Sequence, residues 1–399
     1  DNMGYSFHKY WGQTDISTIQ SYINLRNNYG VPLWMGESGE NSNHWYYEVF
    51  KLLEENNIGW NFWTHKKVDK ITSPYSALVT PQYQVIIDYL RGVAGQPDPN
   101  IAGMGLTSFA NSLKIENCIT RPGVIASLTD PEYGEISKPY ITHSIPGTIP
   151  AAYYDIGARG LSYSDGDYWN DGDGGYNDGW VFRNDGVDVE GSDDDPNIPY
   201  TVGWTEAGEW LGYTIEDVLP GTYDVSFSIS APDAGGIFYA QLSGQNLGVI
   251  DVPSTGGWYS WEDIPSQRIE ITEGEKFLKI QIVQAGFNIQ SVTFDQVLSI
   301  DTQNLNPDSF ILGKPYPNPF NPSVEMNLLV DNSGTYHINI HNIKGELINN
   351  WDVNFTQKGN HIIQWNAMNY GGSLVPSGVF FISVTNQNKS KHRKVLLLR

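Results

Sequence analysis

A carboxylate flanked by glycines ends an apolar segment near the start of the chain. In an extended strand the alternation of side chains places Leu33, Met35 and Glu37 on one face, so Glu37 ends a row of core residues. Gly36 and Gly39 on either side would let a ligand approach the backbone closely. A carboxylate in such a position can act as a nucleophile or as a general acid or base.

Polar and aromatic residues occupy matching positions in the two neighbouring segments. By the same alternation, His8 and Tyr10 share a face on the preceding segment, and Asn61 and Trp63 share one on the following segment. We expect three consecutive strands to present these groups at one rim. In a (β/α)8 barrel, the rim at the strand ends carries catalysis.

The elements that would position these groups alternate between strand and helix. The apolar spacing predicts strands at 7–10, 31–37 and 58–63, and helices at 15–28, 45–57 and 81–92. This repeat implies a parallel sheet covered by helices. A complete barrel takes about 250 residues, and only three units are visible. Residues 1–135 are therefore expected to be the C-terminal part of a barrel, poorly stable in isolation.

Composition excludes several classes of protein. The chain has 399 residues with 45 acidic and 23 basic side chains, a formal charge of −22, which repels nucleic acid. Aromatic residues reach 13%, as in globular domains. The single Cys118 allows no internal disulfide and is expected to be a buried small hydrophobe. No apolar run approaches the roughly 18 residues of a membrane span.

Residues 136–300 show a different pattern, with short strands between clusters of Gly, Asp, Asn and Pro. The segment 222–229 alternates strictly after a turn, which is typical of a half-buried strand, so the zone is predicted to be a β-sandwich. Residues 165–195 contain eleven acidic side chains and one basic one. Two interpretations stay open, a solvated loop and a calcium site, because Ca²⁺ prefers several carboxylate and carbonyl oxygens. The acidic residues are Asp165, Asp167, Asp171, Asp173, Asp178, Asp185, Asp188, Glu190, Asp193, Asp194 and Asp195.

Residues 301–399 follow a short linker, 301–307, and return to alternating strands such as 336–341 and 379–384. The last eleven residues carry five basic side chains and no acidic one. We expect a small β-sandwich with a basic C-terminal strand.

The first zone resembles glycoside hydrolase family 5, the cellulase family of retaining enzymes. The resemblance rests on Phe7–Trp11, Pro32–Gly39 and Gly59–Trp63, which look like the sixth, seventh and eighth barrel strands in the correct order. It implies that Glu37 is the nucleophile, that His8 and Tyr10 support the sugar and the carboxylate, and that Trp63 forms a stacking floor.

Retaining hydrolysis needs a second carboxyl group about 5–5.5 Å from the nucleophile. The family supplies it from an Asn-Glu pair at the end of strand four, and that strand is absent here. Glu40 lies in a loop, and Glu48, Glu54 and Glu55 have the spacing of helix-surface residues. We therefore expect the chain to be the C-terminal part of a longer glycosidase and to be inactive alone.

The second zone resembles carbohydrate-binding module family 6 over nearly its whole length. The segments that carry the resemblance are Val202–Leu211, Thr255–Trp258 and Gly286–Ile289. It implies that Trp204 and Trp258 sandwich a sugar ring and that Asn288 bonds its hydroxyl groups. The family's first strand usually contributes two glutamates to a structural calcium site, whereas Ile149–Ala152 has neither carboxylate. The sequence therefore leaves the metal ligands open.

The third zone looks like the C-terminal sorting domain of type IX secretion substrates. The resemblance rests on Tyr316–Pro322 and on the ending Lys394–Arg399. It implies an immunoglobulin-like fold, an encounter with the type IX machinery and a secreted or surface-attached product. A plain structural β-sandwich is the alternative. Asp1–Gly4 carries no secretory signal, so we expect one further upstream.

Together these features predict a multidomain protein, a partial (β/α)8 barrel followed by two β-sandwiches. The expected function is that of a secreted, monomeric, retaining endo-β-1,4-glucanase that binds plant β-glucan and needs no cofactor for catalysis. The alternatives are a non-catalytic carbohydrate-binding surface protein and an enzyme acting on mannan or xylan.

Overall fold

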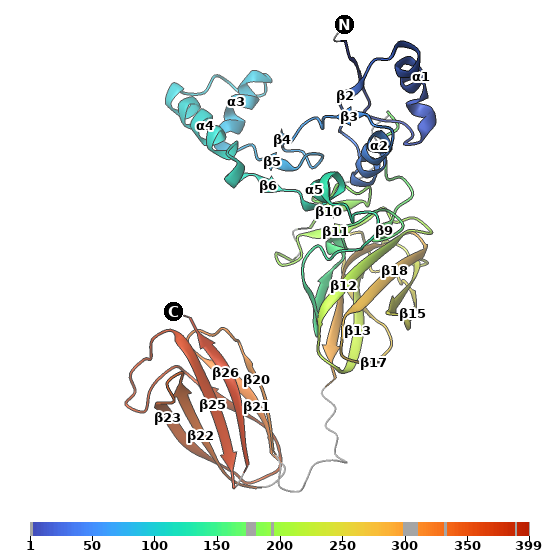
Figure 1. Cartoon of the computed structure of the whole chain (residues 1–399). Helices are drawn as coiled ribbons and strands as arrows, with labels where there is room; N and C mark the ends of the chain where they lie inside the picture. The colour runs from blue at the N-terminus through green and yellow to red at the C-terminus, as the bar shows by residue number, and fades with distance from the viewer. Residues whose placement is uncertain are drawn as a thin grey trace. The chain divides into compact units, whose positions relative to one another are not determined.

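The computed structural model describes residues 3–172, 181–192, 195–297, 310–330, 333–387 and 389–398. The chain forms two compact units, 1–298 and 299–399 (Figure 1). The domain boundary expected at 135/136 lies within the first unit, and the linker expected at 301–307 lies outside the described residues.

A parallel sheet opens the first unit. It consists of β1 (Tyr5–His8), β2 (Leu33–Glu37) and β3 (Gly59–Trp60), in that order. The helix α1 (Gln20–Tyr29) connects β1 to β2, and α2 (Asn43–Glu55) connects β2 to β3. The alternation predicted from the sequence is thus present for two strand–helix units and the strand that follows them.

Local sequence signals set the ends of these helices. Gly30 ends α1 in the left-handed region, at φ 62°, and donates its N–H to the Arg26 carbonyl. The Ser42 hydroxyl caps α2 by accepting from the Trp45 N–H. One face of α2 is buried in the core that it shares with the sheet, which explains its amphipathic spacing. The core here contains Phe7, Ile19, Ile23, Leu33, Met35, Trp45, Tyr46, Val49, Phe50, Leu53, Ile58 and Val124.

The third expected unit differs from the prediction. Its helix forms as α3 (Pro81–Leu90), but α3 packs against α4 (Pro99–Ser112), a helix that the sequence pattern did not reveal. The rings of Tyr83 and Phe109 stack at 4.2 Å between them. Before and after this pair lie β4 (Lys66–Val68), β5 (Tyr75–Ala77) and β6 (Ile119–Thr120), which form a separate small sheet, and then α5 (Pro122–Thr129), which packs on α2.

Two antiparallel-rich sheets form the β-sandwich of the first unit (Figure 1). The larger sheet has the strand order β10-β11-β19-β13-β16, with β8 also paired to β19 and β17 to β13. The smaller has the order β15-β14-β18-β12-β7, with β9 on β12. The predicted alternation of 222–229 is confirmed as β13, whose inward residues Val225, Phe227 and Ile229 are buried.

The strands of the two sheets have these bounds. The larger sheet contains β8 (Gly147–Pro150), β10 (Val189–Gly191), β11 (Tyr200–Val202), β13 (Gly221–Ser230), β16 (Glu262–Pro265), β17 (Ile269–Ile271) and β19 (Asn288–Gln296). The smaller contains β7 (His143–Ile145), β9 (Tyr163–Ser164), β12 (Trp210–Val218), β14 (Ile237–Leu242), β15 (Gln245–Asp251) and β18 (Lys276–Gln284).

A buried polar network joins the N-terminal region to this sandwich. The Asn43 amide donates to Asp185 at 2.6 Å, and the Asn184 amide donates to the Asn41 carbonyl at 2.7 Å. Asp185 also pairs with Arg183 at 2.8 Å, and both side chains are 3% exposed. Because buried polar groups are stable only when their hydrogen bonds are satisfied, this network fixes the contact between the two regions.

The second unit is a β-sandwich of its own, as predicted. One sheet has the order β20-β21-β24 and the other β23-β22-β25-β26. The strands are β20 (Phe310–Tyr316), β21 (Val324–Val330), β22 (Gly334–Asn342), β23 (Leu347–Phe355), β24 (Gly359–Trp365), β25 (Gly378–Asn386) and β26 (Lys389–Leu397). The basic residues predicted for the last strand lie on β26, except Arg399, which lies outside the described residues.

Two smaller expectations can be compared with the structure. Cys118 is half-buried rather than buried, because its thiol lies near the surface, where it donates to the Ser112 and Lys114 carbonyls. Across the described ranges, no helix has the length and apolarity to cross a bilayer.

Candidate functional site

Two indole rings border a cavity on the sandwich of the first unit. Trp204 follows β11 and is 48% exposed, and Trp258 lies between β15 and β16 and is 46% exposed. Asn288, the first residue of β19, is only 4% exposed. These three side chains, together with Glu190 and Tyr259, line a cavity of about 160 Å³. The structure therefore brings together the three residues predicted to bind sugar.

Hydrogen bonds hold this cavity in shape. The Asn288 amide donates to the Trp258 carbonyl at 3.1 Å and to Glu190 Oε1 at 3.3 Å. The Tyr259 hydroxyl donates to Glu190 Oε2 at 2.9 Å. Three segments far apart in the sequence are thus tied together around one amide. The side-chain oxygen of Asn288, Oδ1, lies close to Gly203. A Cβ atom at residue 203 would lie 3.0 Å from this oxygen.

The backbone of Trp204 is strained. Its φ is 45°, in the left-handed region, which bulky residues rarely adopt. Strain of this kind costs on the order of 1–3 kcal/mol and is concentrated at functional sites. A half-exposed tryptophan gains little for stability from such a conformation, so the strain is better explained by a requirement on where the indole points.

The sequence placed Glu190 only in the acidic run and gave no role in sugar binding to it or to Tyr259. The sequence does contain a signal for Glu190. Val187 and Val189 alternate as in a strand, which places residue 190 on the face opposite to theirs, and in the structure both valines are buried. Tyr259 had only its position next to Trp258. Neither residue type is distinctive alone, and the hydrogen bond between them requires the loop between β15 and β16 to lie beside β10, which is distant in the sequence.

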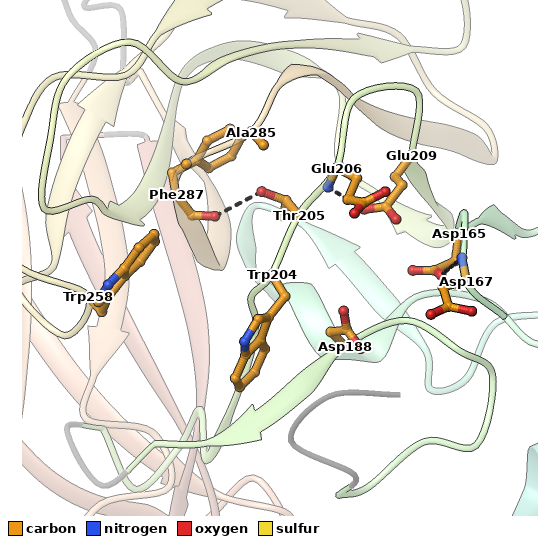
Figure 2. A pocket seen from close by; sticks show the side chains of 11 residues that line it. Asp165, Asp167, Asp188, Trp204, Thr205, Glu206, Glu209, Trp258, Ala285 and Phe287 are labelled. Atoms are coloured by element: carbon orange, nitrogen blue, oxygen red, sulfur yellow. Dashed lines mark hydrogen bonds between the residues drawn. The ribbon is translucent and has the colours of Figure 1, made fainter. Parts of the chain in front are cut away.

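A larger cavity, of about 360 Å³, adjoins the same two indoles. In Figure 2 Trp204 lies between Trp258 and a group of carboxylates. Trp204 and Trp258 are shared by the linings of both cavities. The larger cavity is lined by Asp165, Asp167, Asp188, Trp204, Thr205, Glu206, Glu209, Trp258, Ala285, Gly286 and Phe287.

Two of these carboxylates share an unusual environment. Burial, followed by the charges of Glu209 and Asp188, raises the pKa of Asp165 to about 9. Burial also raises the pKa of Glu209. The backbone N–H groups of Gly166 and Glu206 donate to Glu209 at 3.2 and 2.7 Å, which favours its ionised form. The two acids therefore titrate as a pair, and burial raises the pKa of both.

The acidic run does not form a solvated loop throughout. Asp165 and Asp185 are buried, and Asp167 and Asp188 line the larger cavity. Asp173, Asp178, Asp193 and Asp194 lie outside the described residues.

No calcium site is evident in the described parts of the chain. There, no group of three or more His, Cys, Asp or Glu side chains is arranged to hold a metal ion. Ala151 and Ala152, where the family has its glutamates, are buried and apolar. The calcium interpretation that the sequence left open therefore has no ligand group among these residues.

The residues predicted for catalysis also meet. The Tyr10 hydroxyl donates to Glu37 Oε2 at 2.7 Å, and His8 Nδ1 lies 3.5 Å from the same oxygen. Burial and then the hydrogen bond to Glu37 raise the pKa of the Tyr10 phenol. Gly39 is required sterically, because a Cβ atom there would lie 2.1 Å from the Trp63 carbonyl oxygen.

Trp63 lies beside this group through its backbone, which donates to the Ser38 carbonyl at 2.6 Å, and its indole is half-exposed. The other carboxylates considered from the sequence make contacts elsewhere. Glu40 pairs with Lys67, and Glu48 with His44. Glu54 accepts from the Trp60 indole at 3.2 Å.

Two family models match parts of the chain. Residues 181–296 match the carbohydrate binding module (family 6), and residues 321–390 match the FlgD Ig-like domain. Among curated proteins, the clotting factor G alpha subunit of Tachypleus tridentatus is 31% identical over 102 residues, which is 25% of this chain and 15% of that protein. The chain thus spans only a small part of that relative's length.

Solved structures similar to this chain include modules of the same family. The C-terminal module of a marine laminarinase from Zobellia galactanivorans is 23% identical and covers 37% of this chain and 95% of its own, with a TM-score of 0.27. A β-1,3-glucan-binding module from Bacillus halodurans is 21% identical and covers 39% of this chain and 99% of its own, with a TM-score of 0.28. Over residues 181–296 the chain is therefore similar to carbohydrate-binding modules of family 6, and over residues 321–390 to the FlgD Ig-like domain.

Proposed function

We propose that this chain binds a polysaccharide through Trp204, Trp258 and Asn288. The observation that carries the proposal is the pair of half-exposed indoles at a cavity that also contains a nearly buried amide. The match of residues 181–296 to a carbohydrate-binding family model supports it independently.

The chemistry of the cavity suits a sugar. The C–H faces of a pyranose pack on aromatic rings, and its hydroxyl groups need directed donors and acceptors. The two indoles supply the apolar surface. Asn288 offers the oxygen of its side-chain amide, and Glu190 and Tyr259 supply further polar atoms in the lining of the same cavity. Because hydrogen bonds already hold these polar groups, binding would require little reorganisation.

Affinity electrophoresis against soluble cellulose derivatives, mixed-linkage β-glucan, xylan and mannan tests the proposal. Retardation in at least one gel, abolished or weakened by Trp204→Ala, is the expected result. The same migration in every gel, with and without polysaccharide, would contradict polysaccharide binding. The polymer that retards the chain would also decide between the β-glucan, xylan and mannan alternatives.

A second function is favoured by the Glu37 group. We propose that Glu37 is the nucleophile of a retaining β-glucanase, with Tyr10 and His8 positioning its carboxylate and Trp63 near the sugar. The support is the hydrogen-bonded cluster at the end of a parallel strand. Hydrolysis by this route requires a second carboxyl group about 5–5.5 Å away. Glu40, Glu48 and Glu54, the candidates weighed from the sequence, instead contact Lys67, His44 and Trp60.

Reducing-sugar release distinguishes the enzyme from a purely binding protein. We expect the chain to release no sugar above background, because Glu40, Glu48 and Glu54 make contacts elsewhere and none takes the place of the acid/base group. Release that survives in Glu37→Gln would contradict the role of Glu37. Release that Glu37→Gln abolishes would support that role but refute the inference of a missing acid/base.

We further propose that residues 301–399 act as a sorting domain and that the protein is secreted or attached to the cell surface. A reporter fused to this segment in a bacterium with type IX secretion should reach the surface or the medium. Retention of the fusion inside the cell would leave the plain structural sandwich as the better interpretation.

A further inference from the structure

The two cavities beside the tryptophans are parts of one binding surface. Trp204 and Trp258 line both of them. The smaller cavity holds the Asn288 amide, and the larger one, more than twice its volume, has room for a further sugar unit at about 360 Å³. A glycan chain seated on the indoles would therefore enter the larger cavity with a neighbouring unit.

The larger cavity has more acidic residues in its lining than the smaller one. Among the described residues, its lining contains the carboxylates of Asp167, Asp188, Glu206 and Glu209 beside the buried Asp165, and no Lys, Arg or His. The smaller cavity adds Glu190 and, in the part of the chain that the structure describes, has no basic residue in its lining either. A ligand on this surface thus meets mainly negative charge and hydrogen-bond acceptors, because the Thr205 and Tyr259 hydroxyls already donate to the Phe287 carbonyl and to Glu190.

We propose that the larger cavity is a second compartment of the polysaccharide site, and that its carboxylates make the site select uncharged glycans over glycans with uronate or sulfate groups. This inference rests on the proposed polysaccharide binding. It assigns Asp167 and Glu206 as residues that determine specificity.

The physical reason is the difference between a hydroxyl group and an anion. A sugar hydroxyl donates to a carboxylate in a charge-assisted hydrogen bond. A carboxylate or sulfate on the sugar offers no donor there and is repelled by like charge. The repulsion acts over about a Debye length, which is about 10 Å at 0.1 M salt. Negative potential therefore selects against the anionic ligand, as like charges at interfaces select against wrong partners.

Two derivatives of one backbone test the proposal. Hydroxyethyl cellulose is neutral and carboxymethyl cellulose is anionic, and the comparison is repeated with matched derivatives of the polymer that retards the chain most. Dissociation constants are measured for the full chain at 20 mM and 500 mM NaCl in the presence of EDTA. The variant carries Asp167→Asn with Glu206→Gln. The matched control carries Asp217→Asn with Glu270→Gln, two exposed carboxylates of β12 and β17 outside both cavities.

We expect at least tenfold weaker binding of the anionic derivative at low salt, and a smaller ratio at 500 mM NaCl because salt screens the repulsion. The cavity variant should reduce the low-salt ratio at least threefold, and the control should leave it within twofold of the wild type. The neutral polymer should still bind the cavity variant, which shows that the variant is folded.

Equal affinity for both derivatives at low salt, or a ratio changed as much by the control as by the cavity variant, would overturn the inference while leaving polysaccharide binding intact. Tighter binding of the anionic polymer, especially with Ca²⁺ in place of EDTA, would overturn it in favour of a cation-bridged site. Failure to bind any polymer would instead refute the proposed function itself.

Discussion

Removal of the Trp258 indole is predicted to weaken polysaccharide binding by roughly one and a half to two orders of magnitude. Trp258 is 46% exposed, and an indole presents roughly 150–250 Å² of surface. A sugar that covers the exposed part therefore removes about 100 Å² from water. At about 25 cal/mol per Å² this is roughly 2.5 kcal/mol, or about 60-fold in the dissociation constant at 1.4 kcal/mol for each factor of ten.

Isothermal titration calorimetry of Trp258→Ala against the best oligosaccharide measures this loss. Trp34→Ala is a matched control, because Trp34 has nearly the same exposed fraction, 45%, but lies on β2, away from both cavities. Circular dichroism of each variant checks that it is folded. A folded Trp258→Ala with wild-type affinity, or an equal loss in Trp34→Ala, would refute the assignment of the indole as a stacking surface.

Three further predictions concern stability. Asp165→Asn should raise the melting temperature at pH 8 and flatten the decline of stability with rising pH that the wild type shows. The reason is that folded Asp165 keeps its proton up to about pH 9, whereas the unfolded carboxyl loses it near its ordinary pKa of about 3.9. Parallel profiles of melting temperature against pH for the two proteins would contradict this. Arg183→Met should lower the free energy of unfolding by about 3–5 kcal/mol in urea titrations, because it leaves a buried carboxylate without its partner; a change under 1 kcal/mol would contradict the structural role. Gly39→Ala should lower the melting temperature, because its Cβ would clash with the Trp63 carbonyl. Gly103→Ala lies in the interior of α4 with open space around it and should stabilise the chain by up to about 1 kcal/mol. A higher melting temperature for Gly39→Ala than for Gly103→Ala would count against the close approach of the two backbones at Gly39.

Periodicity predicted those elements whose environment is local. Strand and helix spacing located β1, β2, α1 and α2, because each buries one regular face and ends at a strong signal such as Gly30 or Ser42. The same spacing could not reveal that α3 packs against α4, because an apolar helix face does not state its partner. The small sheet β4-β5-β6 was missed because strands of two or three residues carry too little pattern.

The site was predictable to the extent that its residues lie in recognisable segments. Trp204, Trp258 and Asn288 come from three such segments, and the structure brings them to one cavity. The acidic compartment could not be predicted from spacing, because Asp165 and Asp188 join Glu206 and Glu209 only when β9, β10 and the start of β12 meet. A run of aspartates in a sequence is equally compatible with solvent, a metal or a binding wall, and burial decides between them.

The position of a bound glycan tests the central claim most directly. A crystal structure of the chain with a neutral oligosaccharide of the polymer that it binds best should show one sugar ring against the indoles of Trp204 and Trp258, with a hydroxyl within hydrogen-bond distance of the Asn288 side chain. A neighbouring unit should enter the cavity lined by the carboxylates. A sugar seated elsewhere on the chain, with both indoles uncovered, would contradict the account.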